Sequence, residues 1–92
     1  MAKICVKVEM FSMNQDIYIA ENGEIKHIAT VPMDRVGEMI FSLAGTHEVD
    51  EIEINGNAEY IQSIGYDVLD GMEKFYSDKN VRVKLNGEIF NK

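Results

Sequence analysis

Residues 49–85 of this 92-residue chain read VDEIEINGNAEYIQSIGYDVLDGMEKFYSDKNVRVKL, and this stretch decides the fold. Apolar residues alternate with polar ones over residues 49–54 and again over residues 81–85, which is typical of half-buried strands. Between the two strands, helical spacing predicts a helix over residues 58–76, with an apolar stripe of Ile61, Ile64, Val68, Met72 and Phe75. The stretch therefore predicts a strand, a long helix and a second strand.

Three further strands are predicted upstream of this stretch. Residues 3–10 alternate strictly, and their inward face consists of Ile4, Val6, Val8 and Met10. Residues 16–21 and 24–31 flank the dipeptide Asn22-Gly23, which favours a type I′ hairpin turn because both of its residues tolerate positive φ. We therefore expect three consecutive antiparallel strands.

A first, shorter helix is predicted between the third and fourth strands. Pro32 ends the third strand, Asp34 is placed to cap the helix and Gly45 to stop it. Its apolar stripe is Val36, Met39, Ile40 and Leu43.

The order of elements predicts the architecture. Right-handed crossovers place both helices on one face of the sheet. We therefore expect an α+β fold, a two-layer sandwich with a five-stranded mixed sheet, in one domain that covers residues 1–92. The other face should be polar, with charges paired between strands, and it consists of Lys3, Lys7, Glu9, Glu51, Glu53, Arg82 and Lys84. Asn86-Gly87 repeats the earlier turn, so residues 88–91 either form a loop or fold back as a short strand.

This order of strands and helices, βββαβαβ, resembles the core of the ribonuclease H-like superfamily, which includes resolvases, integrases and the half-domains of actin-like ATPases. The resemblance covers nearly the whole chain and rests on element order, without a catalytic signature. Residues 52–58 are similar to the strand, turn and helix start that face nucleotide in actin-like ATPases, although Asn57 departs from the consecutive glycines usual there. Small phage proteins have a similar look. A ferredoxin-like arrangement is the main structural alternative.

Composition limits the classes of function. The 46% hydrophobic and 27% charged content is that of an ordinary globular domain. The net charge of −7 disfavours nucleic acid, whose binding depends on Lys and Arg that neutralise phosphates. An acidic protein can instead target a basic protein surface.

Cysteine usage and hydropathy bear on the compartment. The single Cys5 cannot form an intramolecular disulfide, which favours a reducing compartment, and we expect the cytoplasm. No apolar run approaches the ~20 residues of a membrane span, so no membrane association is expected.

The resemblance implies a test for nuclease chemistry, because such nucleases hold two metal ions with carboxylates from the first strand, the first helix and the fourth strand. The residues at those places are Glu9, Glu38 and Glu53, and the alternation turns Glu9 and Glu53 away from the helix side. We therefore expect no catalysis, no metal and no cofactor. The alternative is a minimal metal-dependent nuclease or resolvase that uses these three residues in a different register.

Other candidate sites have simpler interpretations. The turn Asn55-Gly56-Asn57 precedes a helix whose free N–H groups could receive an anion, but helix capping is the favoured role of its asparagines. His27 and His47 have no second ligand at metal-like spacing, and Cys5 has no motif partner.

The favoured function is a small acidic, non-catalytic interaction or regulatory module for an unknown protein partner. A third hypothesis is an acidic mimic of nucleic acid that occupies a DNA-binding protein. Many ribonuclease H-like domains continue past the fifth strand into another helix, whereas here only residues 88–92 follow the last turn. Exposed sheet edges therefore predict a homodimer, with interface candidates Lys79, Arg82, Lys84, Ile89 and Phe90. In the alternative, a monomer, Phe90 folds back onto its own core.

Overall fold

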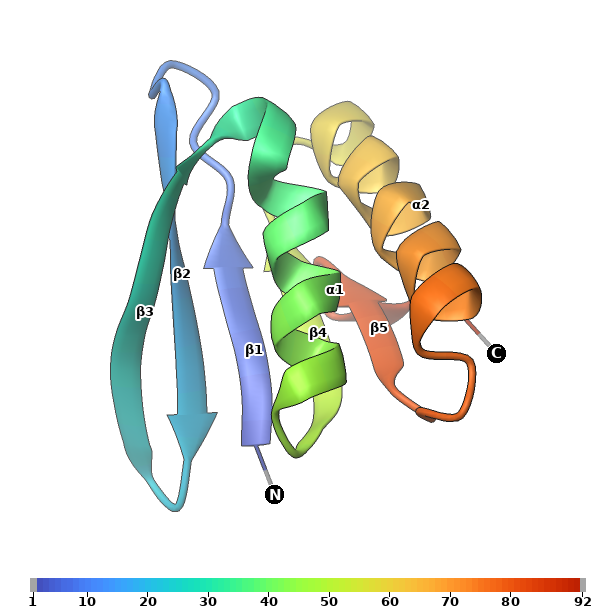
Figure 1. Ribbon diagram of the computed structural model, residues 1–92. Coiled ribbons are helices and arrows are strands. Elements are labelled where there is room, and N and C mark those ends of the chain that lie inside the picture. Colours follow the sequence, from blue (N-terminus) through green and yellow to red (C-terminus); the bar gives the residue numbers. More distant parts are fainter. Residues whose placement is uncertain (1, 92) are drawn as a thin grey trace.

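The computed structural model describes residues 2–91, and in it two helices pack against one face of a six-stranded mixed sheet (Figure 1). The elements in chain order are β1 (Ala2–Lys7), β2 (Asn14–Glu21), β3 (Glu24–Pro32), the 3₁₀ turn η1 (Met33–Arg35), α1 (Val36–Thr46), β4 (Val49–Asn55), α2 (Ala58–Phe75), β5 (Arg82–Leu85) and β6 (Glu88–Ile89).

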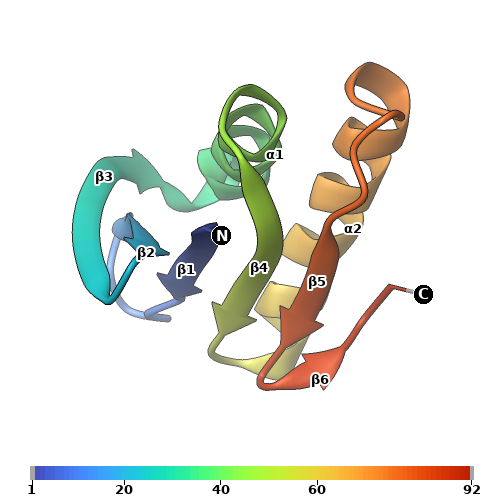
Figure 2. The same cartoon turned by 90° about the horizontal axis from the view of Figure 1, so that it is seen from below.

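The sheet has the strand order β3-β2-β1-β4-β5-β6. The first three strands are antiparallel neighbours, and β4 runs parallel to both β1 and β5. Figure 2 shows both helices above the same face of the sheet, which leaves the other face uncovered. The predicted α+β class, the mixed sheet and the two helices are therefore confirmed.

The core fills the space between the sheet and the helices. Alternate residues of the central strands point into it, and the deepest of them, Ile4, Ile52 and Ile54, are fully buried. The predicted helix stripes cover them with Val36, Ile40 and Leu43 of α1 and with Ile61, Ile64, Val68 and Met72 of α2. Burial of one such side chain contributes about 1.5–3 kcal/mol, so this layer drives folding.

Both Asn-Gly turns adopt the same conformation. Asn22 and Gly23 have φ of 53° and 80°, and Asn86 and Gly87 have φ of 50° and 83°. Positive φ at both positions is the signature of a type I′ turn, which confirms the prediction for the first hairpin. The second turn returns the chain antiparallel to β5, so the sheet has six strands and the predicted number of five was wrong.

The start and end of α1 differ from the prediction. The side chain of Asp34 caps no helix, because it lies inside η1, which precedes α1. Gly45 does not stop the helix either. The helix continues to Thr46, and its last turn is closed when the His47 N–H donates to the Leu43 carbonyl at 2.9 Å.

Two predicted core residues lie outside the core. Met10 is 46% exposed because β1 ends at Lys7 and the chain turns away from the sheet. Phe75 is 61% exposed, because it is the last residue of α2 and stacks on Phe41 instead of packing on the sheet.

Glycines bring the two helices close together. A Cβ on Gly37 of α1 would lie 2.7 Å from Asp67, and a Cβ on Gly71 of α2 would overlap the ring of Phe41. Each helix therefore has a glycine, without a side chain, at the point where a side chain of the other helix packs against it. Gly71 thus allows α2 to pack closely against α1.

Candidate functional site

The open face of the sheet carries a charge network across three strands. The Lys3 Nζ lies 2.9 Å from a carboxylate oxygen of Glu53 and 3.9 Å from Glu51, and the Lys84 Nζ lies 3.3 Å from Glu51. The hydrogen bond to Glu53 raises the pKa of Lys3. The predicted pairing of charges between strands is thus confirmed for these four residues, and the charges of the network largely neutralise one another.

The three carboxylates of the alternative nuclease site do not converge. Glu53 belongs to the network on the open face, whereas Glu38 lies on α1, in the layer that covers the other face. Glu9 is exposed in the loop after β1. Within residues 2–91, no three His, Cys, Asp or Glu side chains form a group that could hold a metal ion.

Cys5 lies on the open face beside the network and is half-buried. Burial raises the pKa of its thiol. A raised pKa reduces the fraction of thiolate, which is the nucleophilic form. This environment favours a structural role for Cys5.

The turn before α2 uses its polar groups inside the fold. The Asn57 side chain accepts a hydrogen bond from the Glu59 N–H at 3.1 Å, which confirms the predicted cap. The Asn86 carboxamide accepts from the Gly56 N–H at 2.9 Å and donates to the Gly56 carbonyl at 3.0 Å. These bonds join the turn to the β5–β6 hairpin, and they occupy the Gly56 N–H of the candidate anion site.

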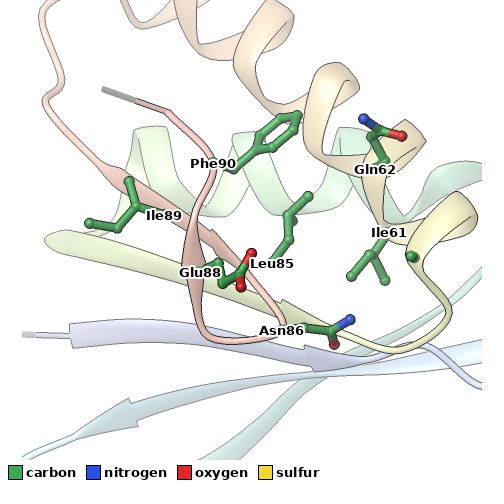
Figure 3. Close-up of a pocket in the computed structure, with 8 residues that line it drawn as sticks. Ile61, Gln62, Leu85, Asn86, Glu88, Ile89 and Phe90 are labelled. Atoms are coloured by element: carbon green, nitrogen blue, oxygen red, sulfur yellow. The ribbon is translucent and has the colours of Figure 1, made fainter.

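A hollow of about 420 Å³ lies between the start of α2 and the β5–β6 hairpin (Figure 3). Ile61, Leu85 and Phe90 supply its apolar walls, and Gln62 and Glu88 are the polar side chains beside them. The C-terminal segment, residues 88–90, forms one side of this hollow.

The residues predicted for a dimer interface have different environments. The ring of Phe90 packs edge-on against Tyr66, with centroids 5.0 Å apart, so this residue folds back onto α2 as in the monomer alternative. Lys84 is paired with Glu51. Ile89, together with Lys79 and Arg82, is exposed.

The β1–β2 loop, at the same end of the parallel strands as the turn before α2, presents apolar side chains to solvent. Phe11 is 98% exposed, and Met10 and Met13 flank it on the surface. The loop is nevertheless held in place by the buried carboxamide of Gln15. This carboxamide accepts a hydrogen bond from the Glu9 N–H at 2.7 Å and donates one to the Glu9 carbonyl at 3.0 Å. No sequence pattern had marked Gln15 for this role.

A second hollow, of about 620 Å³, is a groove on the outer surface of the helix layer. From the α1 side it is lined by Asp34, Glu38, Phe41 and Ser42, and from α2 by Asp67, Asp70, Gly71, Lys74 and Phe75. We refer to these nine residues as the helix groove. The rings of Phe41 and Phe75 stack across it at 5.9 Å with an interplanar angle of 14°. The Lys74 Nζ lies 5.6 Å from the centre of the Phe75 ring.

Most of the net charge of the chain lies in the two segments that contain the helices. Residues 33–48 and 57–78, which hold both helices, contain eight of the sixteen acidic residues but only two of the nine basic ones, for a net charge of −6 out of −7. Within residues 2–91, no ion pair involves Asp34, Glu38, Asp67 or Asp70. The helix layer is therefore acidic, and the rest of the molecule is nearly balanced.

Sequence reasoning missed the helix groove because it assigned Phe75 to the core and gave Phe41 no role. A signal was nevertheless present in the spacing of the acids. Asp67 and Asp70 are three residues apart and lie on one side of the long helix, and Asp34 and Glu38, four apart, have the same kind of spacing around the start of the first helix.

Comparison of the sequence with protein-family models and with curated proteins finds no match. Over residues 2–91, neither helix has the combination of length and apolar content that crossing a bilayer requires.

Proposed function

We propose that this protein is a small, non-catalytic interaction module whose acidic helix layer binds a basic surface of a protein partner. The observation that carries the proposal is the uneven charge, because residues 33–48 and 57–78, which contain both helices, hold −6 of the net −7 while the network on the sheet face is internally paired. A predominantly acidic surface attracts a partner of opposite charge and accelerates the encounter. The exposed ring of Phe75 supplies an apolar contact within that surface.

We further propose that the fold is ribonuclease H-like. The element order through β5 and the placement of both helices on one face support this assignment. The wide separation of Glu38 from Glu53 favours a member of this fold class that has no two-metal chemistry. The free, half-buried Cys5 supports the cytoplasm as its place of action.

A second candidate function is mimicry of nucleic acid, in which the helix layer occupies the DNA site of a DNA-binding protein. The carboxylates gathered on one layer favour it. The two candidates differ in a measurable way, since a mimic competes with duplex DNA for its partner and an ordinary interaction module does not.

Affinity capture from the source organism with three baits tests the proposed function. The first bait is the wild-type protein, the second carries Asp67→Asn and Asp70→Asn on the helix layer, and the third carries Lys3→Gln and Glu53→Gln on the sheet face. We expect the wild-type and sheet-face baits to retain the same partner and the helix-layer bait to lose most of it. Loss of the partner only with the sheet-face bait would contradict the proposal.

A further inference from the structure

We infer that the helix groove binds a basic amphipathic helix of a partner protein, with cationic side chains at its acidic end and a large apolar side chain at its aromatic end. This inference rests on the proposed function and names the chemistry of the partner. It is carried by the shape of the groove, by its unpaired charges and by its stacked aromatic pair, of which Phe75 is exposed.

The shape of the groove suits a helix. The contacts Gly37 to Asp67 and Gly71 to Phe41 advance along both helices in the same direction, so α1 and α2 run side by side and parallel. The lining residues run from 34 to 42 on one side and from 67 to 75 on the other, and eight residue steps correspond to about 12 Å at 1.5 Å per residue. That length matches about two turns of a ligand helix, the span over which anchors at positions i, i+4 and i+7 contact a groove.

The two ends of the groove differ in chemistry. Asp34, Glu38 and Asp67 lie toward the start of the parallel helices, whereas Phe41 and Phe75 lie toward their ends. Lys or Arg side chains of a ligand would meet the carboxylates, and an apolar side chain would pack on the exposed ring.

Lys74 adds a preference for one orientation. It is the single basic residue among the nine that line the groove, and it lies at the aromatic end. It therefore repels a cationic side chain placed there.

The charges also disfavour two other occupants. Phosphate groups of nucleic acid would meet four carboxylates that no cation neutralises within residues 2–91. A helix of a second copy of this chain would bring its own negative charge, since α1 and α2 together contain one basic residue, Lys74. The favoured occupant is therefore a helix from a different, basic protein.

A peptide-binding measurement tests this inference. The probe is a fluorescein-labelled, amidated peptide of 16 residues, alanine-based and helical, with Arg at positions i and i+4 and Leu at i+7 and i+8. Its control is a peptide of the same composition in which these residues are spread around the helix. Fluorescence anisotropy at two salt concentrations gives the dissociation constants, and circular dichroism verifies that each variant is folded.

Matched variants separate groove binding from bulk charge. Asp67→Asn with Asp70→Asn neutralises two lining carboxylates. Glu59→Gln with Glu73→Gln removes the same charge from exposed positions of α2 that do not line the groove. We expect the first pair to weaken binding at least fivefold and the second less than twofold.

A single aromatic variant tests the apolar end, and we expect Phe75→Ala to weaken binding about tenfold, as for a buried aromatic anchor. Phe11→Ala removes an exposed aromatic ring that does not line the groove, and it should leave the dissociation constant unchanged.

Each contrary result has a distinct meaning. Equal losses from the two acidic pairs, or equal binding of the two peptides, would overturn the helix groove as the site while leaving an acidic interaction module in place. Absence of binding by the wild-type protein at about 1 mM peptide would overturn the inference outright. The proposed function fails separately, if capture finds a partner that ignores the helix-layer substitutions.

Discussion

Single side chains fix the loops that end the strands of this sheet. Within residues 2–91, Gln15 is the single polar residue that the fold buries, at 1% exposure. Its carboxamide accepts from one backbone N–H and donates to two carbonyls, those of Glu9 and Ser12. The Gln15 side chain thus supplies hydrogen-bond partners to backbone groups of the β1–β2 loop that no neighbouring strand pairs among the described residues. The same bonds fix the loop that carries the exposed Phe11.

Replacement of Gln15 by Leu keeps the size of the side chain and removes all three bonds. We expect a loss of about 1–3 kcal/mol in the free energy of unfolding, because the loop's backbone groups are left without partners. Urea denaturation measures the loss. Gln62→Leu, at an exposed position of α2, is the matched control and should change stability by less than about 0.5 kcal/mol. Equal effects at the two positions would show that the buried bonds are unimportant.

Asp16, on the open face of the sheet, makes the stability of the fold depend on pH. The Thr30 hydroxyl donates to its carboxylate and the His27 ring lies 3.1 Å away, and these contacts lower the pKa of Asp16 below its ordinary value. A lowered pKa in the folded state stabilises the protein above the unfolded pKa, near 4, and this contribution is lost as the pH falls through the folded pKa. The difference in urea midpoint between wild type and Asp16→Asn should therefore shrink as the pH falls below about 4. A difference that stays constant down to pH 2 would contradict this assignment.

At the scale of elements, the pairing of α1 with α2 creates the helix groove. Gly71 lets the ring of Phe41 lie flat on α2, and Gly37 does the same for Asp67 from the other side. Glycine inside a helix costs about 0.5–1 kcal/mol relative to alanine, and this close packing offsets the cost.

Substitution of Gly71 by Ala tests that packing. The new methyl group would overlap the Phe41 ring at atoms close to its attachment, so we expect a loss of about 1–3 kcal/mol despite the better helix propensity of alanine. In a Phe41→Ala background the same substitution should be neutral or stabilising. Thermal and urea unfolding of the four proteins measure the coupling, and stabilisation by Gly71→Ala in the wild-type background would contradict the packing described.

Elements whose signals are local were predictable from the sequence. The alternating strands, the cap at Asn57 and the turn at Asn22-Gly23 depend on neighbouring residues, and the structure has all of them. The exposure of Phe75 was not predictable, because it depends on where the sheet ends beneath α2.

The helix groove was harder still to predict. Its two sides are separated by about 30 residues of sequence, and no single helical pattern shows which face each helix turns to the other. The paired acids were visible in the sequence, but their meaning depends on the contact between the helices.

For the whole molecule, self-association remains a prediction. The C-terminal segment covers one sheet edge, since the Phe90 N–H donates to the Val83 carbonyl at 2.8 Å and the Asn91 side chain bonds to the same strand. Among residues 2–91, nothing pairs with the outer edge of β3, which carries the exposed Ile25. Exposed edges favour strand addition between copies, and the expected state is a two-fold dimer.

Analytical ultracentrifugation across a concentration series measures the oligomeric state. Ile25→Lys on the β3 edge and Ile89→Lys on the C-terminal strand are matched variants, and whichever dissociates the dimer identifies the edge involved. A single 10.4 kDa species at high micromolar concentration would refute the dimer.

We propose that the helix layer, and within it the groove between α1 and α2, contacts the partner. The most direct measurement is nuclear magnetic resonance chemical-shift mapping on the isotope-labelled protein, with the captured partner added unlabelled. We predict that resonances of Glu38, Phe41, Asp70 and Phe75 shift or broaden, while those of the network around Lys3 stay in place. Perturbation confined to the open sheet face or to β3, with the helix groove unchanged, would contradict the claim.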